Sequence, residues 1–64
     1  MTEKVWKYLK SLPQNQLSKF DYLVAYRRLN ISEEDLKNEL QYLAGIGWIK
    51  YYPFIGEAEI HLLR

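Results

Sequence analysis

The sequence contains no cysteine, which excludes disulfide bonds, thiolate metal sites and cysteine nucleophiles and fits a reducing compartment. It also contains no uncharged apolar run close to the roughly 20 residues that a membrane-spanning helix needs. The first ten residues, MTEKVWKYLK, do not resemble a signal peptide. We therefore expect a soluble, cytoplasmic protein.

The chain has no linker, internal repeat or low-complexity segment, and its length allows one domain at most. At 64 residues, folding hides only about 60% of the surface that the unfolded chain exposes, so a stable core needs large side chains. Six tyrosines, two tryptophans and two phenylalanines can provide them. We therefore expect residues 1–64 to form a single domain.

The formal net charge is only +1, but the charges are unevenly distributed. Residues 1–30 carry six basic and two acidic side chains, which gives +4, and residues 31–44 carry one basic and four acidic side chains, which gives −3. Residues 45–64 are neutral in sum. Because the local field steers a partner more than the net charge does, the two regions suit partners of opposite sign.

Apolar residues at helical spacing predict two helices in the first half of the chain. The first runs from Thr2, a candidate cap, until Pro13 ends it. The second begins at Ser18, with Asp21 three positions later as a short capping box. It runs to about Leu29, after which Asn30 can adopt the left-handed conformation that turns the chain.

A third helix begins after Ser32, which is its predicted cap. Its apolar stripe is formed by Leu36, Leu40, Leu43 and Ala44, and it is ended by Gly45 and Gly47. From Trp48 the period changes to that of a β-hairpin, broken at PFIG, residues 53–56. One core is expected from Leu9, Leu36, Leu40, Leu43, Ile49 and Ile60.

The second hairpin strand alternates apolar Ala58, Ile60 and Leu62 with polar Glu57, Glu59 and His61. The three polar side chains are of types that bind divalent metals. The solvated face of a hairpin has the same pattern, however, and we expect that simpler explanation to hold. No arrangement of residues indicates a catalytic nucleophile, so we expect a non-enzyme without metal, cofactor or small-molecule substrate.

These features together resemble the winged helix-turn-helix family. The residues that carry the resemblance are Ala25, Leu29, Asn30, Ile31, Ser32, Leu36, Leu40, Leu43, Gly47, Trp48 and Ile49. The resemblance implies an α+β fold with the order α-α-α-β-β, a single winged-helix domain over residues 1–64. It also implies that the exposed face of the third helix enters the major groove of double-stranded DNA.

The resemblance places a set of DNA-binding candidates on and around the third helix. They are Arg27, Arg28, Lys37, Asn38, Gln41, Tyr42 and Lys50. Asn38 and Gln41 can pair with adenine edges, and Lys37 can reach guanine or phosphate. Arg27 and Arg28 have a second interpretation, as cations favoured at the end of a helix by its dipole. The first hypothesis is therefore a DNA-binding transcription regulator.

Two departures from the family pattern support a second hypothesis, a protein-interaction module or accessory subunit. Glu33, Glu34 and Asp35 stand where phosphates would approach, although carboxylates are also favoured at a helix N-terminus. The expected wing is apolar where basic residues are usual. It can cover the core, contact a protein or, as a third alternative, enter a minor groove.

Surplus apolar side chains further predict a homodimer. The candidate interface residues are Phe20, Leu23 and Val24 on the second helix and Phe54 and Ile55 at the wing tip. If the acidic third helix instead docks on another protein, that partner should present a basic groove.

Overall fold

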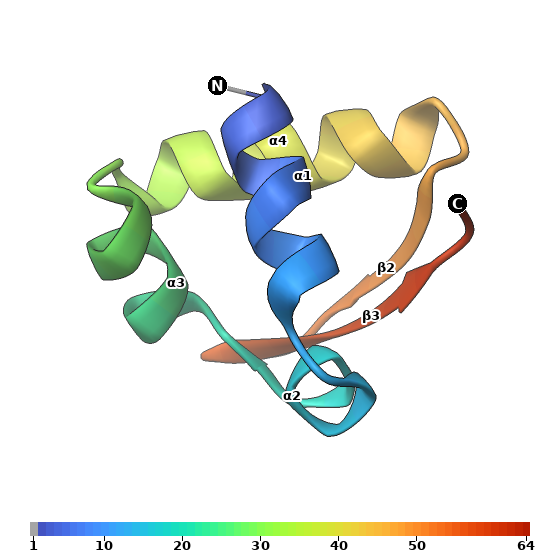
Figure 1. Cartoon of the computed structure of the whole chain (residues 1–64). Helices are drawn as coiled ribbons and strands as arrows, with labels where there is room; N and C mark the ends of the chain where they lie inside the picture. The colour runs from blue at the N-terminus through green and yellow to red at the C-terminus, as the bar shows by residue number, and fades with distance from the viewer. Residues whose placement is uncertain (1) are drawn as a thin grey trace.

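The computed structural model describes residues 2–64 and contains four helices and a three-stranded antiparallel sheet (Figure 1). The elements in chain order are α1 (Thr2–Ser11), α2 (Gln14–Ser18), β1 (Phe20–Asp21), α3 (Tyr22–Leu29), α4 (Glu33–Gly45), β2 (Ile49–Pro53) and β3 (Glu57–Leu62). The α+β class is confirmed. The predicted order α-α-α-β-β misses two short elements, α2 and β1.

One apolar core lies between the helices and the inner face of the sheet. The six predicted core residues are all buried: Leu9, Leu36, Leu40, Leu43, Ile49 and Ile60. In Figure 1, α1 crosses over α4, against which it packs, and the sheet lies below both. Over residues 2–64, no helix has both the length and the apolar character that crossing a membrane requires.

The turn between α3 and α4 forms as predicted. Asn30 adopts the left-handed conformation, with φ 55° and ψ 47°, and its N–H donates to the Arg27 carbonyl. The Ser32 hydroxyl caps α4 by accepting the Asp35 N–H at 3.0 Å. At the other end, Gly45 is the last helical residue, and only Gly47 takes a positive φ, 79°, where the chain turns toward β2.

The predicted start of the second helix at Ser18 is wrong. The Ser18 hydroxyl donates to the Asn15 carbonyl within α2, and α3 begins four residues later at Tyr22. Asp21 is the N-cap of α3, where its carboxylate accepts the Leu23 N–H at 2.9 Å. Between the two helices the backbone extends as β1, because this conformation turns the Phe20 side chain into the core.

Thr2 also has a role other than the predicted one. It is the first helical residue of α1, and its hydroxyl donates to the Glu39 carboxylate on α4. The first turn of α1 is thereby joined to the middle of α4. At the other end, α1 stops at Ser11 and Pro13 precedes α2, as the proline predicts.

The strands are ordered β1-β3-β2, so β2 forms one edge of the sheet. The Leu63 N–H donates to the Trp48 carbonyl and the Phe54 N–H to the Glu57 carbonyl, each at 2.8 Å. Even-numbered residues of β2 therefore bond to β3, and odd-numbered ones face the open edge. Pro53 falls on that open side, where it has no N–H to offer, and so it limits pairing with another strand.

Aromatic rings join α1 to the end of the hairpin. The Trp6 and Trp48 ring centroids are 5.0 Å apart. The Arg64 guanidinium lies 4.9 Å from the Trp48 ring centroid, and the Lys10 ammonium lies 5.3 Å from that of Trp6. Lys10 also donates to the Arg64 carbonyl at 3.1 Å. These contacts hold the C-terminal residue Arg64 against α1 and Trp48.

Candidate functional site

The solvent-facing side of α4 carries three of the predicted DNA-binding residues. Because Leu36, Leu40 and Leu43 hold the opposite side in the core, Asn38, Gln41 and Tyr42 are exposed, as the helical period predicts. Within residues 2–64 no hydrogen bond engages these three side chains. Two amides and a phenol are therefore available to a ligand on a rigid helix.

The first turn of α4 is acidic and exposed. Glu33, Glu34 and Asp35 all face solvent, and none of the basic side chains among residues 2–64 lies within ion-pair distance of them. Their position at a helix N-terminus is electrostatically favourable to the fold. The same three charges disfavour approach of a phosphate backbone at this end of the helix, so any nucleic acid contact must use the middle and C-terminal part of α4.

Lys37 is directed to a neighbouring ring. Its ammonium lies 5.0 Å from the ring centroid of Tyr22, the first residue of α3. The Tyr22 and Tyr51 hydroxyls form a 2.6 Å hydrogen bond that joins α3 to β2. Burial and this hydrogen bond raise the pKa of Tyr51, which keeps its hydroxyl protonated. Lys37 is therefore half-buried above a connected aromatic pair, with only part of its side chain exposed.

The structure separates the two arginines that the sequence presents together. Arg28 lies four residues after Val24, and both line a groove that α3 forms with α1 and α2, which we call the groove beside α3. Arg27 lies four residues after Leu23, on the other flank of the exposed side of α3. Arg28 lines the groove and Arg27 does not, so the two arginines can make different contacts.

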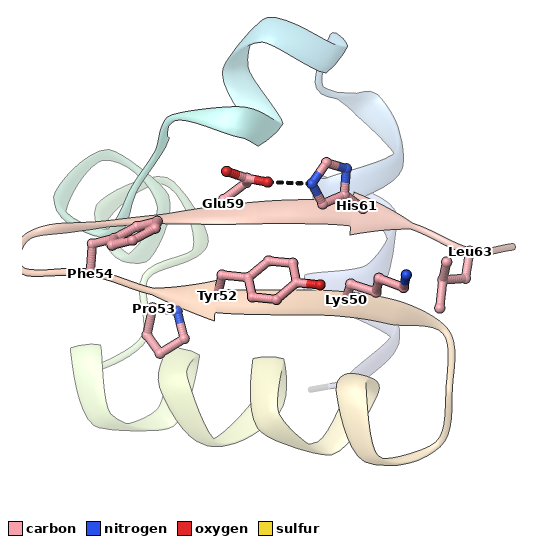
Figure 2. A pocket seen from close by; sticks show the side chains of 7 residues that line it. All are labelled: Lys50, Tyr52, Pro53, Phe54, Glu59, His61 and Leu63. Carbon is pink, nitrogen blue, oxygen red and sulfur yellow. Dashed lines mark hydrogen bonds and ion pairs between the residues drawn. The ribbon is translucent and has the colours of Figure 1, made fainter.

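Lys50 is on the outer face of the hairpin, away from the core (Figure 2). Its sheet neighbour is His61, and the next pair on this face is Tyr52 with Glu59. His61 Nε2 is 2.5 Å from Glu59 Oε2, and its ring meets that of Tyr52 edge-on with centroids 6.1 Å apart. Lys50 thus sits among aromatic and acidic side chains.

The predicted alternation along β3 is confirmed, since Ala58 and Ile60 are buried while Glu57 is exposed and Glu59 and His61 are half-buried. Glu59 and His61 contact each other, but within the described residues no group of three or more acidic, histidine or cysteine side chains could hold a metal ion.

The predicted interface residues divide into one buried residue and four exposed ones. Phe20 is only 1% exposed, so its expected place on a surface was wrong. Its ring meets those of Tyr8 and Tyr22 edge-on, with centroid distances of 6.3 and 6.1 Å. The exposed residues are Leu23, Val24, Phe54 and Ile55.

These four residues lie at one end of the molecule. Asp21 pairs with Glu57, which places the start of α3 next to the closed end of the hairpin (Figure 1). We call residues 54–57 the hairpin tip. The sequence presents the start of the second helix and the wing tip as separate candidates, whereas the structure makes them neighbours.

Sequence analysis missed the groove beside α3. Its apolar lining includes Tyr8, Leu12, Phe20 and Val24, and its cations are Lys19 and Arg28. Three helices and β1 contribute, and a wrongly extended second helix hid their convergence. The one local signal was Pro13, which ends α1 and allows the chain to fold back along the groove.

Comparison with protein-family models, with curated proteins and with solved structures found no match to this chain.

Proposed function

We propose that the chain is a winged-helix protein that binds double-stranded DNA, with α3 and α4 as the helix-turn-helix and β2 and β3 as the wing. The turn at Asn30, the cap at Ser32 and the sheet order β1-β3-β2 support this arrangement. Transcription regulation is the corresponding cellular role.

The observation that carries the proposal is the exposed row Asn38, Gln41 and Tyr42 on α4. Amide side chains presented by a rigid helix can form paired hydrogen bonds with adenine in the major groove. Arg27, at the end of the preceding helix, supplies an exposed cation for the phosphate backbone. The acidic first turn of α4 favours contact by its later turns.

The test is fluorescence anisotropy with mixed double-stranded fragments at low salt. We expect binding at micromolar concentrations, with log affinity falling against log salt at a slope of about −3, because roughly three phosphates are neutralised per chain. Arg27→Ala should weaken binding to all sequences alike. Asn38→Ala and Gln41→Ala should change which sequence is preferred.

Lys7→Ala is the matched control, because it also removes one exposed cation but from the outer side of α1. It should change the affinity less than Arg27→Ala does. No binding at tens of micromolar, beyond the usual non-specific range, would overturn the DNA proposal.

The outer hairpin face favours a second candidate, a protein-interaction module. Tyr52, Phe54 and Leu63 are all exposed there, and Phe54 keeps 58% of its surface accessible. Exposed aromatic and aliphatic side chains of this kind mark protein contacts. With the acidic turn of α4, they suit a partner that is both apolar and basic. If variants of this protein that no longer bind DNA still bind such a partner, that result would support this candidate.

A further inference from the structure

We infer that the hairpin tip of one chain docks in the groove beside α3 of a second copy, so that two chains exchange tips. The groove and the tip are complementary in both polarity and charge, and they are neighbours on the molecule. This inference goes beyond DNA binding and does not depend on it, because the contact is between protein surfaces.

The groove has an apolar floor and a basic rim. Tyr8, Leu12 and Val24 supply its accessible apolar surface, and the almost fully buried Phe20 also lines it. Lys19 and Arg28 form the rim, and neither makes an ion pair within residues 2–64. Their positive charge is therefore available to an acidic group of a partner.

The groove is lined by two cations, Lys19 and Arg28, and by one carboxylate, Asp21, so its charge is positive in sum. Asp21 accepts the backbone N–H of Leu23 at 2.9 Å and so caps α3. Burial raises the pKa of Tyr8, and the charge of Arg28 partly offsets that rise. The charges of Arg28 and Asp21 act on Tyr8 in opposite directions, so both side chains lie close enough to influence the apolar part of the groove.

The tip has the features that such a groove accepts. Phe54 is largely exposed and Ile55 is fully exposed, and the exposed carboxylate of Glu57 follows two positions later. The turn is held closed by the 2.8 Å bond from the Phe54 N–H to the Glu57 carbonyl, with Gly56 at φ 80°. A rigid apolar tip loses little conformational freedom on docking.

The tip cannot enter the groove of its own chain. Asp21 lines the groove and is also the sheet partner of Glu57, so the pairing of β1 with β3 fixes the tip beside the groove. A two-fold axis near this end lets each chain offer its tip to the other, which makes the same contact twice. Pro53 on the open edge of β2 disfavours the alternative, a dimer made by joining two sheet edges.

The test measures mass against concentration by light scattering and sedimentation equilibrium, without nucleic acid, from micromolar to millimolar protein. We expect the 7.7 kDa chain to form a species of twice that mass. Arg28→Glu and Glu57→Arg should each raise the dissociation constant by at least about tenfold, because each places like charges together. A mixture of the two variants in equal amounts should restore association as a heterodimer.

Lys7→Glu and Glu3→Arg are matched controls, since they make the same charge reversals on the exposed side of α1. They should leave the dissociation constant unchanged, and circular dichroism should show all variants folded. A parent chain that stays monomeric at millimolar concentration would overturn the inference. A dimer that is indifferent to both reversals, or a mixture that does not recover, would overturn it equally.

Discussion

Replacing Phe20 by alanine tests the arrangement of β1 most directly. The Phe20 side chain is among the largest that are fully buried, and it lies between the rings of Tyr8 and Tyr22. Truncation of a buried phenylalanine costs about 3–5 kcal/mol through lost transfer energy and the cavity that remains. A domain of this size has a total stability of roughly 3–10 kcal/mol.

The loss is therefore comparable with the whole stability of the fold. At about 4–8 °C per kcal/mol, the midpoint of thermal unfolding should fall by at least about 12 °C. Circular dichroism and urea titration of the parent, Phe20→Ala and Leu23→Ala measure this. Leu23 is exposed on the next element and is the control, with an expected change of less than about 0.5 kcal/mol.

The opposite ranking would refute the reasoning. If residues 18–29 formed one helix with Phe20 on its surface, Phe20→Ala would leave the unfolding midpoint near that of the parent. Equal effects of Phe20→Ala and Leu23→Ala would likewise contradict the burial that β1 provides.

Three other substitutions test separate features. Leu40→Ala should destabilise the domain by roughly 2–5 kcal/mol in urea titration, and a sharp transition near the parent's would contradict the leucine stripe. Asp21→Ala should cost about 0.5–2 kcal/mol through loss of the α3 cap, whereas Ser18→Ala should cost less, and the reverse order would restore the helix start at Ser18. The raised pKa of Tyr51 favours its neutral form in the folded chain, so this contribution to the free energy of unfolding should be present below about pH 10 and be lost as the pH rises above it. In Tyr51→Phe, which leaves the Tyr22 hydroxyl without its partner, stability should fall less steeply over the same range. Parallel stability curves for the two chains would argue against the raised pKa.

The sequence was sufficient to predict the parts of the fold that depend on local signals. The α3–α4 turn follows from the left-handed preference of Asn30 and the cap at Ser32, and the burial of Leu36 and Leu40 follows from their spacing. Each of these features is determined by residues a few positions apart, so a single sequence is enough to predict it. The outward direction of Asn38, and with it the candidate DNA-binding face, follows from the same period.

The remainder depends on contacts between residues far apart in the chain. A two-residue strand such as β1 has no periodicity of its own, and Phe20 adopts it because Ala58 is its sheet partner. The serine and aspartate at positions 18 and 21 match a capping box, but the cap is Asp21 itself. The groove and the proximity of the hairpin tip to α3 both follow from that unpredicted strand.

The position of β1 also bears on the order in which the chain folds. Phe20 and Ala58 close a loop that contains α3, α4 and β2, whereas β2 and β3 are joined by a turn of a few residues. Closing a long loop costs more entropy than closing a short one, so the hairpin and α4 should form before β1 docks. The β1–β3 pairing then forms last in folding. Its amide protons should exchange with solvent sooner than those between β2 and β3.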